Sequence, residues 1–351
     1  MKNMIKKSLS FTMLMAASVL SFTSCEDWTE VEPVDIVTPQ MNDQLKADYI
    51  ENLKQYKMSD HKLMIVSFEN KTERPSNQSE HLTVLPDSID VVSMNNPKAV
   101  NEVIEQEMTS IREKGTKIVY NVDYSVIEKD WNQKVKEDES ASLTEEDALA
   151  YITKCTKEQL ALCDEFGYDG ITFTFMGRSA VSMTEPMKAQ YAARLNNFVE
   201  PIAAWRSAHA GMWFSFIGNP QYLTMDQKAL LADCDYIILP TDMVNDMDEL
   251  SVKAFAAIGT GVCPLDRIVV MAQTVRPDDD KQIYGYFGTY DENGERMRSI
   301  YGSAVWCSKE SAHFTRRGLM IRNAELDYFD NTLVYGNIRE AINIMNPSSK
   351  N

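Results

Sequence analysis

The sequence predicts an α/β protein built as a single (β/α)8 barrel. Eight short apolar runs, most of them ending in polar residues, follow one another between residues 63 and 322. Segments with helix signals separate most of these runs, and such an alternation over roughly 300 residues is what a (β/α)8 barrel requires, allowing for insertions beyond its usual ~250. A doubly wound open sheet is the alternative. No glycine-rich phosphate-binding loop follows any of the runs, which favours the barrel.

The N-terminal segment has the layout of a secretory signal. Residues 1–24 have a basic start, an apolar middle and then small residues, and they are too short and too interrupted to favour a membrane-spanning helix. The run Phe22–Cys25 resembles a bacterial lipobox, in which the cysteine, here Cys25, is lipidated and becomes the new N-terminus. The alternative is an ordinary signal peptide with an incidental cysteine. Glu26 and Asp27 resemble the surface-export signal of some lipoproteins of Gram-negative outer membranes, so a surface-exposed, lipid-anchored location is expected.

The chain after residue 24 is predicted to consist of a tether, one barrel domain and a short tail. Residues 25–41 lack periodicity and are predicted to be a tether, residues 42–346 the barrel, and residues 347–351 a short tail. Removal of the three lysines in residues 1–24 takes the formal charge from −17 to −20, which argues against nucleic acid and against anionic polysaccharide as partners. A neutral glycan is compatible with this charge. Because residues 1–24 do not favour a membrane-spanning helix, contact with the membrane is expected only through the lipid on Cys25.

Cysteine and histidine usage gives no sign of a metal site or a disulfide framework. Five cysteines follow Cys25, and they are scattered, odd in number and without CxxC or His-x-His spacing. No cofactor is predicted. The five are expected to be mostly small buried apolar residues: Cys155, Cys163, Cys234, Cys263 and Cys307.

The eight predicted strands are recognised as short apolar runs. The fourth is the clearest, because Ile171, Phe173 and Phe175 alternate with Thr172, Thr174 and Met176, as on a strand with two different faces. The predicted strands are Leu63–Phe68, Ile89–Met94, Lys117–Tyr124, Gly170–Met176, Met212–Ile217, Tyr236–Leu239, Ile268–Gln273 and Leu319–Arg322.

Helix signals lie before, between and after these strands. The sharpest is Thr144 followed by Asp147, which resembles a capping box. Trp131 lies in a charged segment without a predicted helix and is a candidate for exposure. The predicted helices are Asn42–Tyr56, Pro97–Lys114, Thr144–Phe166, Pro186–His209, Met225–Ala232, Asp248–Ala257, Gly294–Ala312 and Asn331–Ile344.

The stretch Tyr168–Gly177 resembles the fourth-strand signature of glycoside hydrolase family 18, the chitinases and endo-β-N-acetylglucosaminidases. That signature runs Asp-Gly-x-Asp-x-Asp-x-Glu, and Asp169 and Gly170 match its opening. Thr172 and Thr174 stand in place of the two inward aspartates, and Met176 in place of the acid glutamate. The first three strands also resemble a lipoprotein branch of the family that is associated with host N-glycan use by gut bacteria, in the segments His61–Phe68, Leu85–Ser93 and Gly115–Tyr120.

The resemblance implies a binding protein that does not cut its ligand. In the family the acetamido group of the substrate attacks the anomeric carbon, an aspartate supports it, and a glutamate protonates the departing oxygen. A thioether cannot donate a proton, and a positioned general acid contributes roughly 10²–10⁴-fold in rate. Two further departures are a missing Ser-x-Gly-Gly motif, replaced by Asn121–Tyr124, and a sixth strand ending in Leu239–Asp242 without a recognisable tyrosine.

Because barrel proteins carry their sites at the carboxyl ends of the strands, the candidate ligand contacts are taken from those ends. Polar tips there match sugar hydroxyls. The candidates are Glu69, Asn95, Asp123, Tyr124, Thr174, Met176, Asn219, Asp242, Gln273 and Asn323. Tyr222 and an aromatic loop, which contains Tyr286 and Tyr290, add faces on which pyranose rings stack, although these rings would equally serve to pack the loop onto the barrel.

Three functions remain open at this point. The first is a surface-anchored protein that binds an N-glycan-like oligosaccharide for a neighbouring glycosidase and an outer-membrane importer. The second is an active glycosidase of the endo-β-N-acetylglucosaminidase type, in which Glu69, Asp123, Asp242 or Glu325 has replaced the missing acid. The third is a structural subunit of an outer-membrane glycan-uptake complex.

Overall fold

The computed structural model describes residues 43–138, 140, 142–276, 279, 281–290, 293–329 and 333–347. The described residues from Asp48 onward make up one compact unit, which contains the barrel. The predicted signal, lipidation site and tether, residues 1–41, fall outside the described residues, so these remain predictions. No helix in the described ranges is long and apolar enough to cross a membrane.

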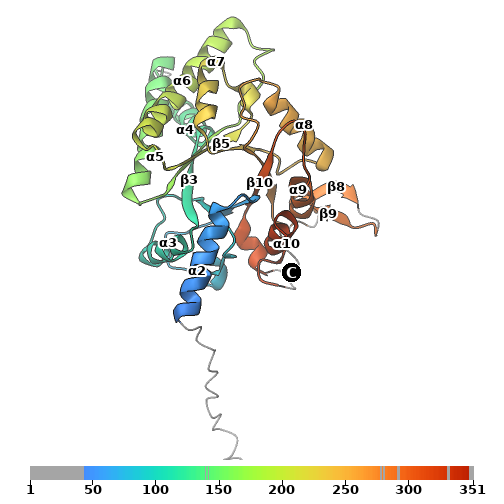
Figure 1. Ribbon diagram of the computed structural model, residues 1–351. Helices are drawn as coiled ribbons and strands as arrows, with labels where there is room; N and C mark the ends of the chain where they lie inside the picture. The colour runs from blue at the N-terminus through green and yellow to red at the C-terminus, as the bar shows by residue number, and fades with distance from the viewer. Residues whose placement is uncertain are drawn as a thin grey trace, which may run out of the picture. The chain divides into compact units, whose positions relative to one another are not determined.

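The predicted barrel is confirmed. Within the described part of the chain, eight parallel strands close in the order β1-β10-β7-β6-β5-β4-β3-β2, and Figure 1 shows the helices outside them. Seven strands lie within one or two residues of the predicted bounds, while β10 begins before the predicted Leu319. The barrel strands are β1 (Leu63–Phe68), β2 (Val91–Met94), β3 (Lys117–Asp123), β4 (Gly170–Phe175), β5 (Trp213–Gly218), β6 (Tyr236–Leu239), β7 (Ile268–Gln273) and β10 (Arg316–Arg322).

The helices lie in the predicted segments, but several bounds differ: α3 and α10 begin five residues after the predicted starts, at Glu102 and Gly336, and α7 ends at Lys228 rather than at Ala232. Two further corrections concern the elements themselves. Tyr124 does not end the third strand but begins a helix, α4, which the sequence analysis missed. The predicted helix from Gly294 begins only at Ser299, because the preceding residues pair in a hairpin of β8 (Tyr286–Tyr290) and β9 (Arg296–Arg298). The helices are α2 (Asp43–Met58), α3 (Glu102–Glu113), α4 (Tyr124–Glu137), α5 (Glu145–Glu165), α6 (Glu185–Ala208), α7 (Met225–Lys228), α8 (Met247–Ile258), α9 (Ser299–Ser308) and α10 (Gly336–Met345).

Local contacts on α4 and α5 test two further predictions, and short 3-10 turns complete the connections between elements. The capping box at the start of α5 is present, since the Thr144 side chain accepts from the Asp147 N–H and the Asp147 carboxylate accepts from the Thr144 N–H. Trp131 on α4 is buried against Tyr151, with ring centroids 5.5 Å apart, so its expected exposure is wrong. The turns are η1 (Gln78–Glu80), η2 (Leu82–Val84), η3 (Pro220–Tyr222), η4 (Ala229–Asp233) and η5 (Ala324–Phe329).

Two apolar layers stabilise the barrel: one lies between the strands and the helices, and the other fills the barrel interior. On β4, Phe173 and Phe175 face outward into the layer between strands and helices, and Phe173 stacks on Phe214 of β5 with centroids 5.2 Å apart. Thr172 and Thr174 face the barrel interior and are almost fully buried. The predicted two-faced strand is thereby confirmed, and its inward face is the one that leads to the mouth of the barrel.

Candidate functional site

A cavity of about 440 Å³ opens at the carboxyl ends of the barrel strands. Most of its wall is polar, and a neighbouring hollow of about 630 Å³ shares Asn95, Asn121, Asp123 and Val126 with it, so the two form one continuous cleft. The mouth cavity is lined by Ser67, Glu69, Ser93, Asn95, Asn121, Asp123, Val126, Thr174, Met176, Ile217, Met271, Met320, Arg322 and Asn323.

The end of β4 presents no ionisable group to this cavity. The Thr174 hydroxyl donates to the Asn121 amide oxygen on the adjacent β3 at 2.7 Å. Met176 follows the strand and lines the cavity with 40% of its surface exposed. The Asn219 side chain donates to the Met176 carbonyl oxygen at 2.8 Å and so fixes the backbone beyond the strand. A hydroxyl, an amide and a thioether therefore line this part of the cavity.

Two carboxylates on the cavity wall act as hydrogen-bond acceptors. The Glu69 side chain accepts from the amides of Asn95 at 2.7 Å and Asn96 at 2.8 Å. The Asp123 carboxylate caps α4, accepting from the Ser125 N–H at 2.8 Å and the Ser125 hydroxyl at 2.7 Å. In both arrangements the carboxylate oxygens are already engaged as acceptors.

Asp242 and Gln273 lie behind the cavity wall and hold part of it. The Asp242 carboxylate pairs with the Arg322 guanidinium at 2.7 Å, and Arg322 itself lines the cavity. The Gln273 amide donates to the Asp242 carbonyl oxygen at 3.0 Å and is buried. Glu325 on η5 is outside the cavity lining. Burial raises the pKa of its carboxyl group, and its Oε2 atom has no hydrogen-bond partner among the described residues.

The structure brings six of the candidate residues together at one cavity: Glu69, Asn95, Asp123, Thr174, Met176 and Asn323. Seven others lie outside its lining: Tyr124, Asn219, Tyr222, Asp242, Gln273, Tyr286 and Tyr290. Of these, Tyr124 is a core residue, because its ring packs edge-on against Phe175 with centroids 5.2 Å apart. Asn323 adopts a left-handed backbone conformation, and its N–H donates to the Ser67 hydroxyl at 3.0 Å, which joins β10 to β1 at the mouth.

The aromatic loop forms the β8–β9 hairpin. Phe287 is buried and anchors the hairpin, as the packing alternative expected for one of these rings. Tyr290 is 62% exposed, with the Arg296 guanidinium 5.7 Å from its ring centroid. Arg276 lies over the Tyr284 ring at 4.0 Å. The hairpin thus combines an anchored ring with an exposed one, at a place separate from the cavity lining.

Sequence reasoning missed four polar residues of the cavity wall. Ser67, Ser93 and Asn121 lie two positions before Glu69, Asn95 and Asp123, so each is the next inward residue down its strand. The fourth is Arg322, the last residue of β10. The two-residue period would have found the first three. The described residues contain no cluster of His, Cys, Asp or Glu that would hold a metal ion.

Barrel proteins bind their ligands at the carboxyl ends of the strands. The mostly polar cavity at this end therefore defines a barrel protein that binds a polar ligand. The chain belongs to glycoside hydrolase family 18: the family model described as "Glycoside hydrolase family 18, BT1044-like" matches residues 29–344. No match was found among the curated proteins.

Solved structures share the fold at low sequence identity. A variant of BT1044 superposes with a TM-score of 0.60 at 16% identity, covering 89% of this chain and 94% of that one. The apo endo-β-N-acetylglucosaminidase from Cordyceps militaris gives 0.57 at 15%, covering 85% and 95%. A doubly substituted form of that fungal enzyme, in complex with fucosyl-N-acetylglucosamine-Asn, gives 0.55 at 14%, again covering 85% and 95%.

Proposed function

We propose that this protein is a cell-surface lipoprotein that binds an N-glycan-like oligosaccharide containing N-acetylglucosamine and does not hydrolyse it. The observation that carries the proposal is Met176 at the end of β4, at the position where the resemblance to family 18 puts the acid glutamate. A thioether has no proton to give. Thr174, at the position of an inward aspartate, is engaged with Asn121 and offers no charge to an acetamido group.

The cleft is suited to binding neutral sugars. Amides and hydroxyls of Asn95, Asn121, Asn323 and Ser67 supply donors and acceptors of the kind that sugar hydroxyls pair with. Membership of family 18 supports a sugar ligand, and a structural neighbour is known with fucosyl-N-acetylglucosamine-Asn bound. An anchor at Cys25 would hold this cleft outside the outer membrane, where it would pass oligosaccharide to a neighbouring glycosidase and importer.

The test is calorimetry and turnover on the same preparation. The mature chain, titrated with an N-glycan oligosaccharide, should bind it saturably, and it should release no oligosaccharide from an N-glycoprotein. Asn95→Ala should weaken binding by about 1 kcal/mol, the usual worth of one hydrogen bond. The matched control, Asn132→Ala on the exposed face of α4, should leave the affinity unchanged. Steady release of oligosaccharide by the wild type contradicts the proposal, and absence of binding together with absence of turnover favours the structural-subunit alternative.

A second candidate is a glycosidase with a relocated acid, and one observation favours it. Glu325 is a carboxyl group whose pKa burial raises, as a general acid near neutral pH requires. It lies on η5 just after β10, near the mouth but not on the cavity wall. If the wild type shows any turnover, Glu325→Gln should abolish it under this second candidate, whereas turnover that survives the substitution excludes Glu325 as the acid.

A further inference from the structure

A second cavity, of about 390 Å³, lies at the opposite end of the barrel. Its wall contains the first residue of five different strands, since Leu63 begins β1, Val91 begins β2, Lys117 begins β3, Trp213 begins β5 and Tyr236 begins β6. The amino ends of barrel strands ordinarily serve stability rather than binding. An open hollow there has no part in the function proposed above.

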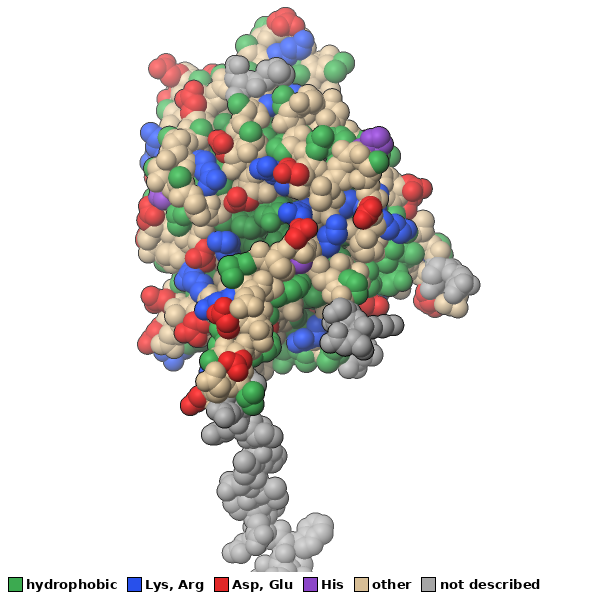
Figure 2. Space-filling model, viewed as in Figure 1, with side chains coloured by type: hydrophobic (Ala, Val, Ile, Leu, Met, Phe, Trp, Pro, Cys, Tyr) green, Lys and Arg blue, Asp and Glu red, His purple; other side chains and the backbone are tan. Residues whose placement is uncertain are grey.

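The floor of this cavity is apolar and contains two aromatic rings. Trp213 and Tyr236 stack with their ring centroids 5.1 Å apart and their planes 26° from parallel. Leu63 and Val91 continue the apolar surface beside them. In Figure 2 the same face has a hollow with hydrophobic side chains at its floor and charged side chains around it. The ring faces and edges left free by this stacking favour an aromatic group as a neighbour.

Apolar side chains separate this cavity from the mouth of the barrel. Ile65, Val119, Ile238 and Val269 pack together in the interior, and each is almost fully buried. This layer lies further along the strands than the residues of the second cavity. A ligand at the amino end would therefore not reach the carboxyl-end cleft.

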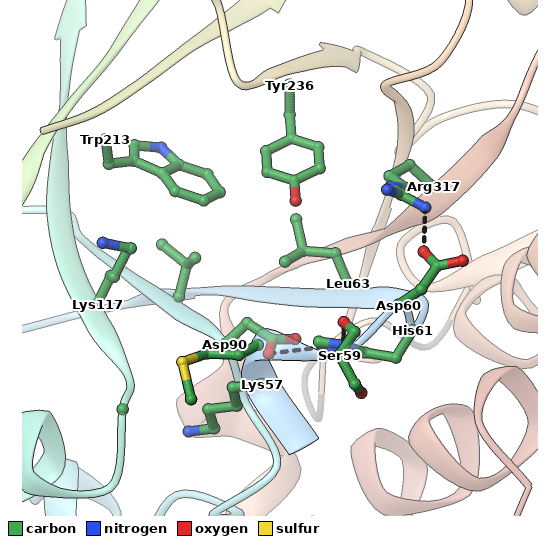
Figure 3. Close-up of a pocket in the computed structure, with 13 residues that line it drawn as sticks. Lys57, Ser59, Asp60, His61, Leu63, Asp90, Lys117, Trp213, Tyr236 and Arg317 are labelled. Carbon is green, nitrogen blue, oxygen red and sulfur yellow. Dashed lines mark hydrogen bonds and ion pairs between the residues drawn. The ribbon is translucent and has the colours of Figure 1, made fainter. Parts of the chain in front are cut away.

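Cationic side chains stand on two sides of the aromatic pair. Figure 3 shows Lys117 beside Trp213 and Arg317 on the far side of Tyr236, with the Tyr236 hydroxyl pointing into the cavity. The Lys117 ammonium forms no ion pair with any residue that the structure describes. The Arg317 guanidinium donates to Asp60 at 2.6 Å, and the Asp60 carboxylate is 84% exposed, so this pair is well solvated.

Lys57 is a third cation at the cavity, and its ammonium group forms no ion pair with a described carboxylate. Burial lowers the pKa of Lys57 to about 8, the charges of Asp90 and Asp87 oppose this shift, and the charge of Lys114 adds to it. The Lys57 ammonium donates to the Thr116 hydroxyl at 2.6 Å rather than to a carboxylate. Asp60 and Asp90 also line the cavity, but Asp60 pairs with Arg317 and Asp90 with His61, so Lys57 and Lys117 form no ion pair with a described residue. In a chain with a formal charge of −17, this local excess of cations favours an anionic ligand.

We propose that the amino-end cavity is a second binding site, for a small organic anion with one flat apolar face, of the aromatic carboxylate class. The ring of the ligand lies against Trp213 and Tyr236, and its carboxylate is directed to Lys117 or Arg317. The Tyr236 hydroxyl donates a hydrogen bond to the ligand. The simpler role for these long side chains is to close the bottom of the barrel with their stems while their charged ends stay in water.

Indole-3-acetate and its neutral analogue indole-3-acetamide distinguish these two roles. Calorimetric titration of the mature chain should give saturable binding of the acetate in the millimolar range or tighter, and weaker binding of the amide. Lys117→Gln should weaken acetate binding about fivefold, the effect of one exposed charge contact. Lys157→Gln, at an exposed position on α5, is the matched control and should leave the affinity unchanged.

Three results overturn the proposal: no saturable binding of the acetate, equal affinity for acetate and amide, or an affinity that Lys117→Gln does not change. Because Lys117 is exposed, its substitution should leave the thermal unfolding midpoint unchanged, so a loss of binding reports on the site. Arg317→Gln provides a second variant on the other side of the aromatic pair and should also weaken acetate binding. Oligosaccharide binding at the mouth should be the same in wild type and Lys117→Gln, so the two sites are tested independently.

Discussion

Asp169 and Gly170, the two residues that match the family 18 signature, have structural roles in this chain. The Asp169 carboxylate accepts from the Arg112 guanidinium at 2.9 Å and from the Ile118 N–H at 2.7 Å, which ties α3 and β3 to the start of β4. Gly170 has φ = +146°, and a Cβ atom there would lie 2.1 Å from the Trp213 carbonyl oxygen. The opening of the signature therefore supports the barrel, independently of the chemistry at its other end.

Replacement of Asp169 should cost stability because it leaves donors unpaired. Asp169→Ala removes the acceptor for the Arg112 guanidinium and for a partly buried backbone N–H, so we expect the free energy of unfolding to fall by about 2–3 kcal/mol. Urea denaturation measures this loss. Asp130→Ala, at an exposed position on α4, should stay within about 0.5 kcal/mol of wild type. Equal stability of the two variants would show that the Asp169 contacts contribute nothing.

The pH dependence of stability should report the pair of His61 and Asp90. Burial opposes the charged imidazolium, but the hydrogen bond of 2.9 Å to Asp90 and the charge of that carboxylate raise the pKa of His61. A raised folded-state pKa contributes stability that is fully present below the unfolded value of about 6.5 and is lost as the pH rises through the folded-state pKa. The advantage of wild type over His61→Gln in unfolding free energy should therefore shrink as the pH rises above about 6.5 and through the folded-state pKa, and a difference that stays constant with pH would contradict this.

At the scale of the element, β4 and the β8–β9 hairpin differ in how they present side chains. The strand directs Thr174 into the barrel and Phe175 into the outer layer. Every second side chain of β4 therefore faces the barrel interior and determines which chemical groups are presented there. The hairpin buries Phe287 and leaves Tyr290 exposed, outside the cavity lining. A ligand confined to the cavity would touch the first element and not the second.

Tyr290→Ala should affect long ligands only. An exposed aromatic face on the hairpin can stack on a sugar ring that extends beyond the cavity, so affinity for a complete N-glycan oligosaccharide should fall by about 1–3 kcal/mol, the magnitude of stacking on other planar rings. Affinity for chitobiose, which is short enough to stay within the cavity, should not change. Calorimetric titration with both ligands measures the two effects, and an unchanged affinity for the long ligand removes the hairpin from the binding surface.

At the scale of the whole molecule, the charge and the N-terminal segment determine where the barrel is expected to work. The acidic chain is repelled by anionic polymers, and an anchor would keep it at a surface rather than free in solution. Under the proposed function, a lipid on Cys25 supplies this anchor. The proposed location therefore depends on Cys25.

Loss of the lipidated cysteine should release the protein from the membrane. Expressed in a Gram-negative host, the wild type is expected in the outer-membrane fraction, whereas Cys25→Ala should appear in the soluble or uncleaved form. Fractionation followed by mass measurement of the N-terminus distinguishes the forms. The control is Cys155→Ala, which keeps Cys25 and should fractionate with the wild type. Recovery of Cys25→Ala in the outer membrane would mean that another feature anchors the chain.

The amino-acid sequence by itself determined the barrel and the alternation on β4, because hydrophobic periodicity is a local property. It also puts Met176 at the position on which the proposed lack of hydrolysis depends. The sequence pattern did not predict α4, because its few buried apolar residues lie among many charged ones. It also did not predict the hairpin before α9. Only the tertiary structure decided that Tyr124 belongs to the core, that Ser67, Ser93 and Asn121 join the mouth cavity, and that a second cavity lies at the amino end. These features depend on side chains far apart in the sequence that meet only when the eight strands close.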